Sequence, residues 1–189
     1  MTNWHFIILS CCLLSNVHAA NQTPLSQAER EQLQHHDNSV ISNESPAQLH
    51  LLKSPSRPIA VPSEQLDTLI QQMQQAALTH HGMGITAVQI GIPVRVVLMD
   101  RSGGHGKKAF QAFINPELVF TSTEKIELWE RCLSLPDEPN HLTHRAAHIG
   151  IRYQKPDGQF VSEDLYGLEA GIFQQELDHL NGILLSDVH

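Results

Sequence analysis

One stretch near the end of the chain constrains the fold more than any other. Residues Tyr166 to Leu185 are predicted to form a single helix, because apolar residues recur there at helical spacing. On this helix Gln175 and His179 lie four residues apart and share a face, with Glu176 beside them. Zinc hydrolases carry such a helix with His at the first position, where two imidazoles bind the metal and the glutamate takes a proton from water. The functional interpretation therefore depends on the glutamine at position 175.

The N-terminal segment is typical of a secretory signal peptide. Residues 6–14 are almost wholly apolar, and small residues after them offer a cleavage site behind Ala19, although no Lys or Arg precedes the apolar run. We predict a signal peptide over 1–19 and export to the periplasm or the exterior. The alternative is a cytoplasmic protein in which this segment is a buried strand or helix. After cleavage Cys132 is the one cysteine left, so no intramolecular disulfide is expected.

The charge of the chain excludes some partners. A formal net charge of −8 disfavours a nucleic-acid or anionic-membrane binder, because either would need a basic face. We therefore expect no nucleic-acid partner, and no membrane partner once the signal peptide is removed.

The rest of the chain is predicted to form one domain. Residues 20–48 are polar and predict a linker or flexible arm ahead of a domain over 49–189. Pro116 is expected to end a strand, and residues 137–144 to form a loop. Because strands come first and a buried helix closes the chain, the predicted class is α+β, with antiparallel strands packed around the C-terminal helix. A helix is predicted over 64–80, and strands over 94–99, 110–115, 118–120, 126–129, 147–153 and 160–165.

Two further stretches carry residues suited to chemistry. Gly82 and Gly84 begin a turn that presents Gln89, and the spacing fits neither a dinucleotide-binding loop nor a P-loop. Glu130-Arg131-Cys132-Leu133-Ser134 stands at the predicted end of a strand. By itself Cys132 has three interpretations, a buried core thiol, a nucleophile or a metal ligand.

Together the three stretches resemble the three signatures of the peptide deformylase family, in order and at similar spacing, over about residues 49–185. The resemblance implies hydrolysis of the formyl group of formyl-methionyl peptides. It implies a divalent metal, Fe²⁺ first and Zn²⁺ or Ni²⁺ as alternatives, held by Cys132 and His179, with Gln175 where a second His belongs. It also implies Glu176 as the general base. The oxyanion would be held by the Gln89 side chain and the Leu133 backbone N–H, and the peptide by Gly82, Gly84, Glu130 and Arg131.

Gln175 is the largest departure from the family pattern. An amide oxygen is a neutral ligand that suits hard cations better than iron or zinc, so we expect weaker metal binding and weakened activity. One of three histidines after Cys132 could turn inward to help; they are His141, His144 and His148. The alternative function is a catalytically inactive peptide-binding module. A third, weaker hypothesis is a metallopeptidase that cleaves another amide.

The other departures concern the cleft. Arg131 replaces a small glycine, and its side chain is expected either to crowd the cleft or to pair with Glu130. Arg145 matches a family arginine that pairs with that same glutamate. Asp178 is expected to orient a metal ligand, and the hydroxyl that Thr86 adds to a packed turn is expected to be tolerated.

Overall fold

The computed structural model describes residues 22–103 and 106–188. The predicted signal peptide over residues 1–19 therefore lies outside the described residues. Within the described segments no helix is both long enough and apolar enough to cross a membrane.

A five-stranded antiparallel sheet with the order β1-β2-β3-β6-β7 forms the body of the protein. A separate antiparallel pair, β4 and β5, stands beside it as a two-stranded ribbon. The strand bounds are β1 Gly84–Thr86, β2 Val96–Asp100, β3 Phe110–Thr121, β4 Lys125–Glu130, β5 His141–Ala146, β6 His148–Gln154 and β7 Phe160–Tyr166.

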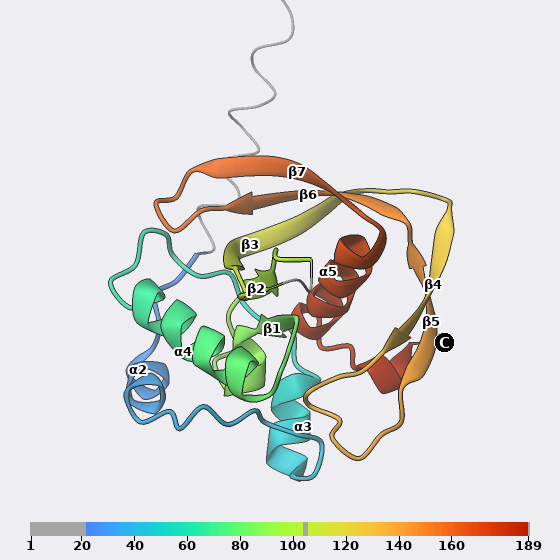
Figure 1. Ribbon diagram of the computed structural model, residues 1–189. Helices are drawn as coiled ribbons and strands as arrows, with labels where there is room; N and C mark the ends of the chain where they lie inside the picture. Colours follow the sequence, from blue (N-terminus) through green and yellow to red (C-terminus); the bar gives the residue numbers. More distant parts are fainter. Residues whose placement is uncertain (1–21, 104–105, 189) are drawn as a thin grey trace, which may run out of the picture.

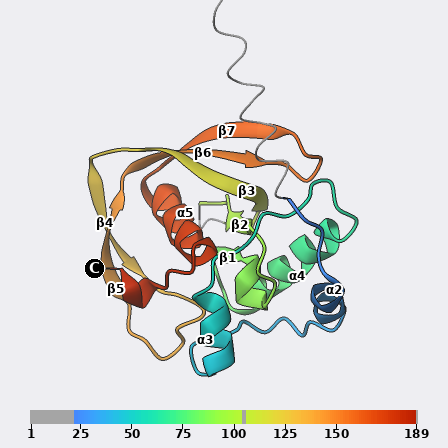
Figure 2. The same cartoon turned by 180° about the vertical axis from the view of Figure 1, so that it is seen from behind.

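Helix α5 (Gly167–Leu180) lies at the centre of the molecule, with the sheet over one side and the β4–β5 ribbon beside it (Figures 1 and 2). This arrangement confirms the α+β prediction of antiparallel strands around a buried C-terminal helix. The other helical elements are α2 Gln27–Gln34, α3 Pro46–Leu52, α4 Leu66–Thr79 and the short 3₁₀ turns η1 Ala87–Ile90 and η2 Leu185–Asp187.

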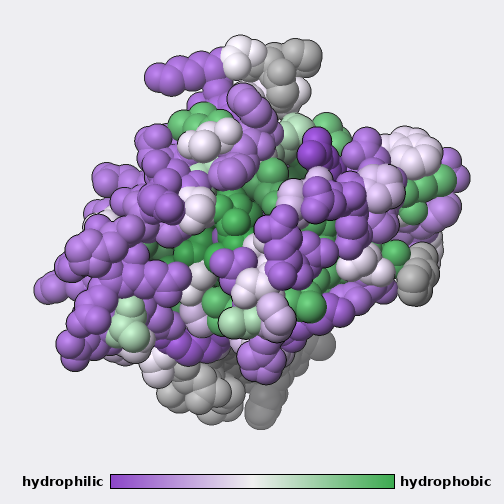
Figure 3. Space-filling view, turned by 90° about the horizontal axis from the view of Figure 1, so that it is seen from below, coloured by the Kyte–Doolittle hydropathy of each residue, from purple (hydrophilic) through white to green (hydrophobic). Residues whose placement is uncertain are grey.

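Apolar side chains gather into three buried clusters. The first joins α4 to β1, η1 and β2, and the second joins α5 to the sheet, where the rings of Phe113 and Phe173 meet edge to face at 4.9 Å. The third surrounds Cys132 with four leucines, which are Leu52, Leu135, Leu184 and Leu185. On the face shown in Figure 3, apolar residues gather near the middle and hydrophilic residues cover most of the remainder.

The segment before the domain differs from the flexible arm that its composition predicts. Ser26 and Glu29 form a capping box that begins α2, with Glu29 N–H donating to Ser26 Oγ over 3.3 Å. Leu25 and Leu33 are buried in the first cluster. The few apolar residues of this polar segment are thus the ones that dock it, because burial of two leucines offsets part of the entropy of ordering it.

Two strands also differ from prediction. β5 occupies residues predicted as a loop, because its inward side chains include Thr143 and Arg145, whose polarity hides the alternation of a strand. β3 continues through Pro116 with a shift of register between Ile114 and Glu117, so the proline lies in a bulge rather than at a strand end. The strands predicted over 110–115 and 118–120 are therefore one.

Both long helices end inside their predicted limits. α4 begins at Leu66 instead of residue 64, and its N-cap residue is Gln65. α5 ends at Leu180 instead of residue 185, and Gly182 follows with a left-handed φ of 76°. The turn directs Leu184 and Leu185 into the cluster around Cys132. The end of α5 thus supports the segment that carries the cysteine.

Candidate active site

Helix α5 presents Glu176 and His179 toward the segment that follows β4. Both side chains are buried, and His179 Nε2 lies 3.1 Å from Cys132 Sγ. The cysteine comes two residues after the end of β4, where its carbonyl accepts a hydrogen bond from Leu135 N–H at 3.1 Å. A helix and a turn separated by more than forty residues in sequence therefore bring an imidazole and a thiol together.

A buried ion-pair network fixes this junction between α5 and the ribbon. Arg145 on β5 binds both carboxylate oxygens of Glu130, at 2.9 and 2.8 Å, and reaches Asp178 of α5 at 2.6 Å. The expected pairing of Arg145 with Glu130 is confirmed. Asp178, expected to orient a metal ligand, contacts the arginine in this network. Arg131 does not pair with Glu130, because Arg145 already occupies both oxygens.

Glu176 lies against the glycine turn on the other side of the site. A Cβ atom added at Gly84 would lie 2.4 Å from Glu176 Oε1, so only glycine leaves room for the carboxylate in this position. Glu176 Oε2 is buried without a hydrogen-bond partner among the described residues. Burial, together with the nearby charges of Glu130 and Asp178, raises the pKa of Glu176 to about 8. A carboxyl group that is fixed in position, but has one oxygen without a hydrogen-bond partner, remains available to exchange a proton.

The neighbouring groups are also shifted by burial. Burial lowers the pKa of His179 to about 4, with a further contribution from the charge of Arg145, so the imidazole is neutral at pH 7. Burial likewise raises the pKa of the Cys132 thiol to about 12, with the charge of Glu176 adding to the effect. The Nδ1 atom of His179 is buried and has no hydrogen-bond partner among the described residues.

Gln89 on η1 is held by both ends of its amide. Its Oε1 accepts hydrogen bonds from the Thr86 backbone N–H at 2.9 Å and the Thr86 hydroxyl at 3.2 Å. Its Nε2 donates to Ser134 Oγ at 3.3 Å. The hydroxyl at position 86 is thus used to orient the amide. Ser134 has a positioning contact that the sequence did not predict, since only the fold places it beside η1.

Gln175 is half-buried, and its Nε2 donates to the backbone carbonyl of Arg131 at 3.2 Å. The three histidines considered as substitute ligands point elsewhere: His141 contacts Glu138, His144 contacts Glu127, and His148 contacts Asp164. Among the described residues no group of three or more His, Cys, Asp or Glu side chains is arranged to hold a metal ion.

The pair formed by Cys132 and His179 nevertheless fits one shared metal. Metal–sulfur and metal–nitrogen distances of about 2.3 and 2.0 Å at a tetrahedral angle place the two donor atoms about 3.5 Å apart. The observed separation of 3.1 Å is close to that value. The third protein donor at this site would be the amide oxygen of Gln175, which is neutral and weak.

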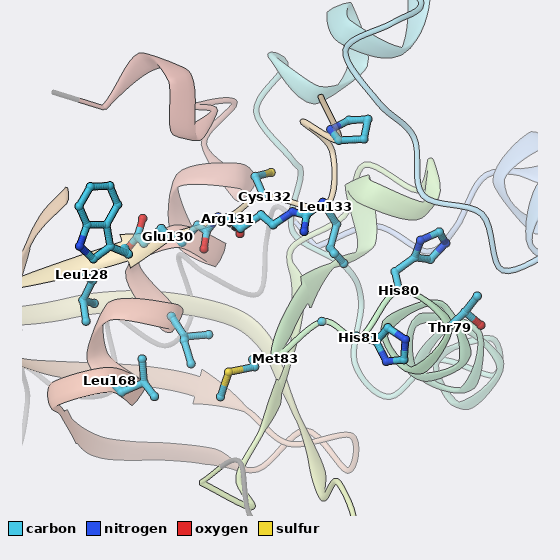
Figure 4. A pocket seen from close by; sticks show the side chains of 15 residues that line it. Thr79, His80, His81, Met83, Leu128, Glu130, Arg131, Cys132, Leu133 and Leu168 are labelled. Atoms are coloured by element: carbon cyan, nitrogen blue, oxygen red, sulfur yellow. Dashed lines mark hydrogen bonds between the residues drawn. The ribbon is translucent and has the colours of Figure 1, made fainter. Parts of the chain in front are cut away.

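Cys132 lines a cleft of about 660 Å³ (Figure 4), and His179 contacts the cysteine from outside the lining. Predicted site residues Gly82, Glu130, Arg131, Cys132, Leu133 and Gln175 line it, whereas Gly84 lies against Glu176. The sequence did not single out the apolar side chains of the lining, because nothing local marks them as cleft residues. They are Met83, Leu128, Trp129, Leu168 and Ile172.

A buried carboxylate, imidazole and thiol gathered beside such a cleft are typical of a hydrolase of amide bonds. The sequence model of the polypeptide deformylase family matches residues 43–189. A peptide deformylase of Rhodopseudomonas palustris strain BisA53 is 40% identical over 138 residues, which are 72% of this chain and 76% of that protein. The chain therefore belongs to the peptide deformylase family.

Solved structures agree with this assignment. The peptide deformylase of Thermotoga maritima matches with a TM-score of 0.72 and 32% identity, over 82% of this chain and 98% of that one. The class I type b peptide deformylase of Acinetobacter baumannii, solved with Met-Ala-Ser bound, matches with a TM-score of 0.71 and 30% identity. That match covers 79% of this chain and 96% of the other.

Proposed function

We propose that this chain is a peptide deformylase that hydrolyses the N-formyl group of formyl-methionyl peptides. The observation that carries the proposal is the arrangement of Cys132, His179 and Glu176, with an S–N distance of 3.1 Å beside an unsatisfied buried carboxylate. Family membership supports the same reaction. The Acinetobacter baumannii deformylase with Met-Ala-Ser bound supports N-terminal peptides as the substrate class.

Cys132 and His179 would hold a divalent metal, Fe²⁺ first and Zn²⁺ or Ni²⁺ as alternatives, with Gln175 turning its amide oxygen inward as a third donor. Such a metal supplies a Lewis acid that lowers the pKa of water. Because the amide is a weaker donor than an imidazole, we expect lower metal affinity and lower turnover than for a site with two histidines.

Other residues of the chain would move the proton and hold the developing charge. In its ionised form Glu176 would take the proton of the attacking water and pass it to the leaving amine, since its Oε2 has no hydrogen-bond partner among the described residues. The Gln89 amide uses one N–H for Ser134, and the second N–H would donate to the formyl oxygen together with the Leu133 backbone N–H. One oriented donor of this kind is worth roughly 3 kcal/mol of transition-state stabilisation.

The test is formate release from a formyl-methionyl peptide. The protein is prepared without oxygen, supplied with iron or nickel, and compared with the same protein after chelation and with Glu176→Ala. We expect metal-dependent release in the first sample and a loss of at least a hundredfold in the other two, with the fold of Glu176→Ala intact. Full activity of Glu176→Ala would refute the mechanism. Peptide binding without any release would favour the inactive binding module instead.

Export remains part of the proposal. We expect the mature protein to begin at Ala20, since the residues before it have the composition of a signal peptide. N-terminal sequencing of the protein from its native host would check this. An intact Met1 or Thr2 terminus would indicate a cytoplasmic protein.

A further inference from the structure

Arg131 carries a charge that nothing in the described structure neutralises. It follows β4 directly, is exposed, and lines the cleft one residue before Cys132 (Figure 4). Its guanidinium has no hydrogen bond or ion pair among residues 22–103 and 106–188. It is the only Lys or Arg among the described residues that line the cleft.

The acidic residue of the cleft does not compensate this charge. Glu130 is the only Asp or Glu of the described lining, and Arg145 binds both of its oxygens. On the other wall Lys108 donates to the carbonyl of Gly82, and its charge interacts with the buried Asp100. The chain as a whole carries −8, so the guanidinium of Arg131 is a local positive charge on an acidic protein. Such a contrast attracts anionic groups to one place.

The reach of the side chain indicates where such a group would lie. An extended arginine places its guanidinium about 6 Å from its Cα atom, given bonds of roughly 1.5 Å. An extended peptide advances about 3.3 Å per residue. The guanidinium of Arg131 therefore reaches the first or second residue beyond the one whose formyl group lies at Cys132 and Glu176.

We propose that Arg131 makes the cleft select N-formyl peptides that carry a carboxylate within two residues after the methionine. The inference rests on the proposed function for the identity of the substrate. The carboxylate has two sources, an acidic side chain or the free C-terminus of a short peptide. A guanidinium binds either one through paired N–H groups.

The experiment uses three peptides of one length: formyl-Met-Ala-Asp-amide, formyl-Met-Ala-Asn-amide and formyl-Met-Ala-Asn with a free C-terminus. We expect kcat/KM to be about two- to fivefold higher for either peptide with a carboxylate than for the uncharged amide, as for a partly exposed ion pair. A gain for the Asp peptide alone assigns a side chain as the source, and a gain for the free terminus alone assigns short peptides. The preference should fall as salt rises from 0.05 to about 0.5 M.

Two variants isolate the arginine. Arg131→Gln should reduce the preference to about one, and Arg131→Lys should keep part of it. Lys155→Gln removes the same charge in the turn between β6 and β7, where Lys155 contacts Gln159, and should leave the preference unchanged. Equal kcat/KM for all three peptides with the parent protein, or an unchanged preference in Arg131→Gln, would overturn the proposal.

Calorimetry with the deformylated peptides separates this proposal from the proposed function. If no peptide releases formate, the proposed function fails, whereas tighter binding of the carboxylate peptides by the parent protein than by Arg131→Gln still supports selection by Arg131. Equal dissociation constants, or no binding of any of the three, would overturn the selection as well.

Discussion

The inner end and the mouth of the cleft differ in how tightly the fold holds their residues. At the inner end Cys132 lines the cleft, with His179 and Glu176 outside the lining; all three are buried, and each touches a neighbour that comes from another part of the chain. At the mouth the guanidinium of Arg131 has no partner among the described residues, and Trp129 is 72% exposed. The positions of the buried residues are therefore fixed by several neighbours, whereas the outer residues can change binding and leave the fold intact.

The departures from the family pattern follow this difference. Arg131 lies at the mouth, and Gln175 stands between the two regions, half-buried and bonded to the Arg131 carbonyl. In the inner network Arg145 and Glu130 form the pair that the family resemblance implies, and Arg145 also binds Asp178, which was expected to orient a metal ligand. The two departures therefore lie outside this buried network.

The largest effect is expected at the inner network. Arg145→Ala should lower the free energy of unfolding by about 3–5 kcal/mol, because it leaves Glu130 buried without its partner. Urea unfolding measures the loss. Arg152→Ala on β6, where the guanidinium lies over the exposed ring of Phe160, should cost about 1 kcal/mol or less. Similar losses in the two variants would remove the distinction between buried and exposed charge.

The second effect is steric and acts on Glu176, the proposed general base. Gly84→Ala places a methyl group 2.4 Å from Glu176 Oε1, so the carboxylate must move and kcat should fall about a hundredfold. Gly150→Ala is the matched control, because its added Cβ meets Phe120 at 3.1 Å on the sheet, away from the cleft. An unchanged kcat in Gly84→Ala would show that the position of Glu176 does not limit turnover.

The third effect concerns the residue between the regions. Gln175→His should raise metal content and formate release together, by roughly tenfold or more. Loss of a residue that only hydrogen-bonds a metal ligand already costs about that factor, and a direct ligand should matter at least as much. Gln175→Ala should lower both if the amide oxygen is a donor. Metal analysis after gel filtration measures the metal content independently of activity. If Gln175→His changes neither metal content nor formate release, another residue limits turnover, and Arg131→Gly is the next variant to test.

The smallest effect on stability is expected at the mouth. Trp129→Ala should change the free energy of unfolding by no more than about 0.5 kcal/mol, because the side chain is 72% exposed. It should raise KM for peptides, since Trp129 lines the cleft. Phe173→Ala in the core of α5 should cost about 3–5 kcal/mol by comparison. A large loss in Trp129→Ala would show that the mouth also supports the fold.

The sequence alone predicted the parts of this protein that depend on local spacing. Helical periodicity placed Gln175, Glu176 and His179 on α5, and alternation located most strands of the sheet. It failed where a local pattern was masked, as in β5, whose inward residues include Arg145, and in α2, where two leucines dock a polar segment. Composition is an average over a whole segment, so it does not reveal the few side chains that determine the structure of that segment.

Only the tertiary structure decided which distant residues meet. The sequence holds Cys132 and His179 47 positions apart, and packing of α5 against the ribbon brings Sγ and Nε2 to 3.1 Å. The same packing brings Glu130 against Arg145. The guanidinium of Arg131 therefore has no ion-pair partner among the described residues. Spacing along a chain fixes which side chains share a face of one element. Partners on different elements are fixed by burial and charge pairing in the folded protein, and these depend on all the contacts of the core together.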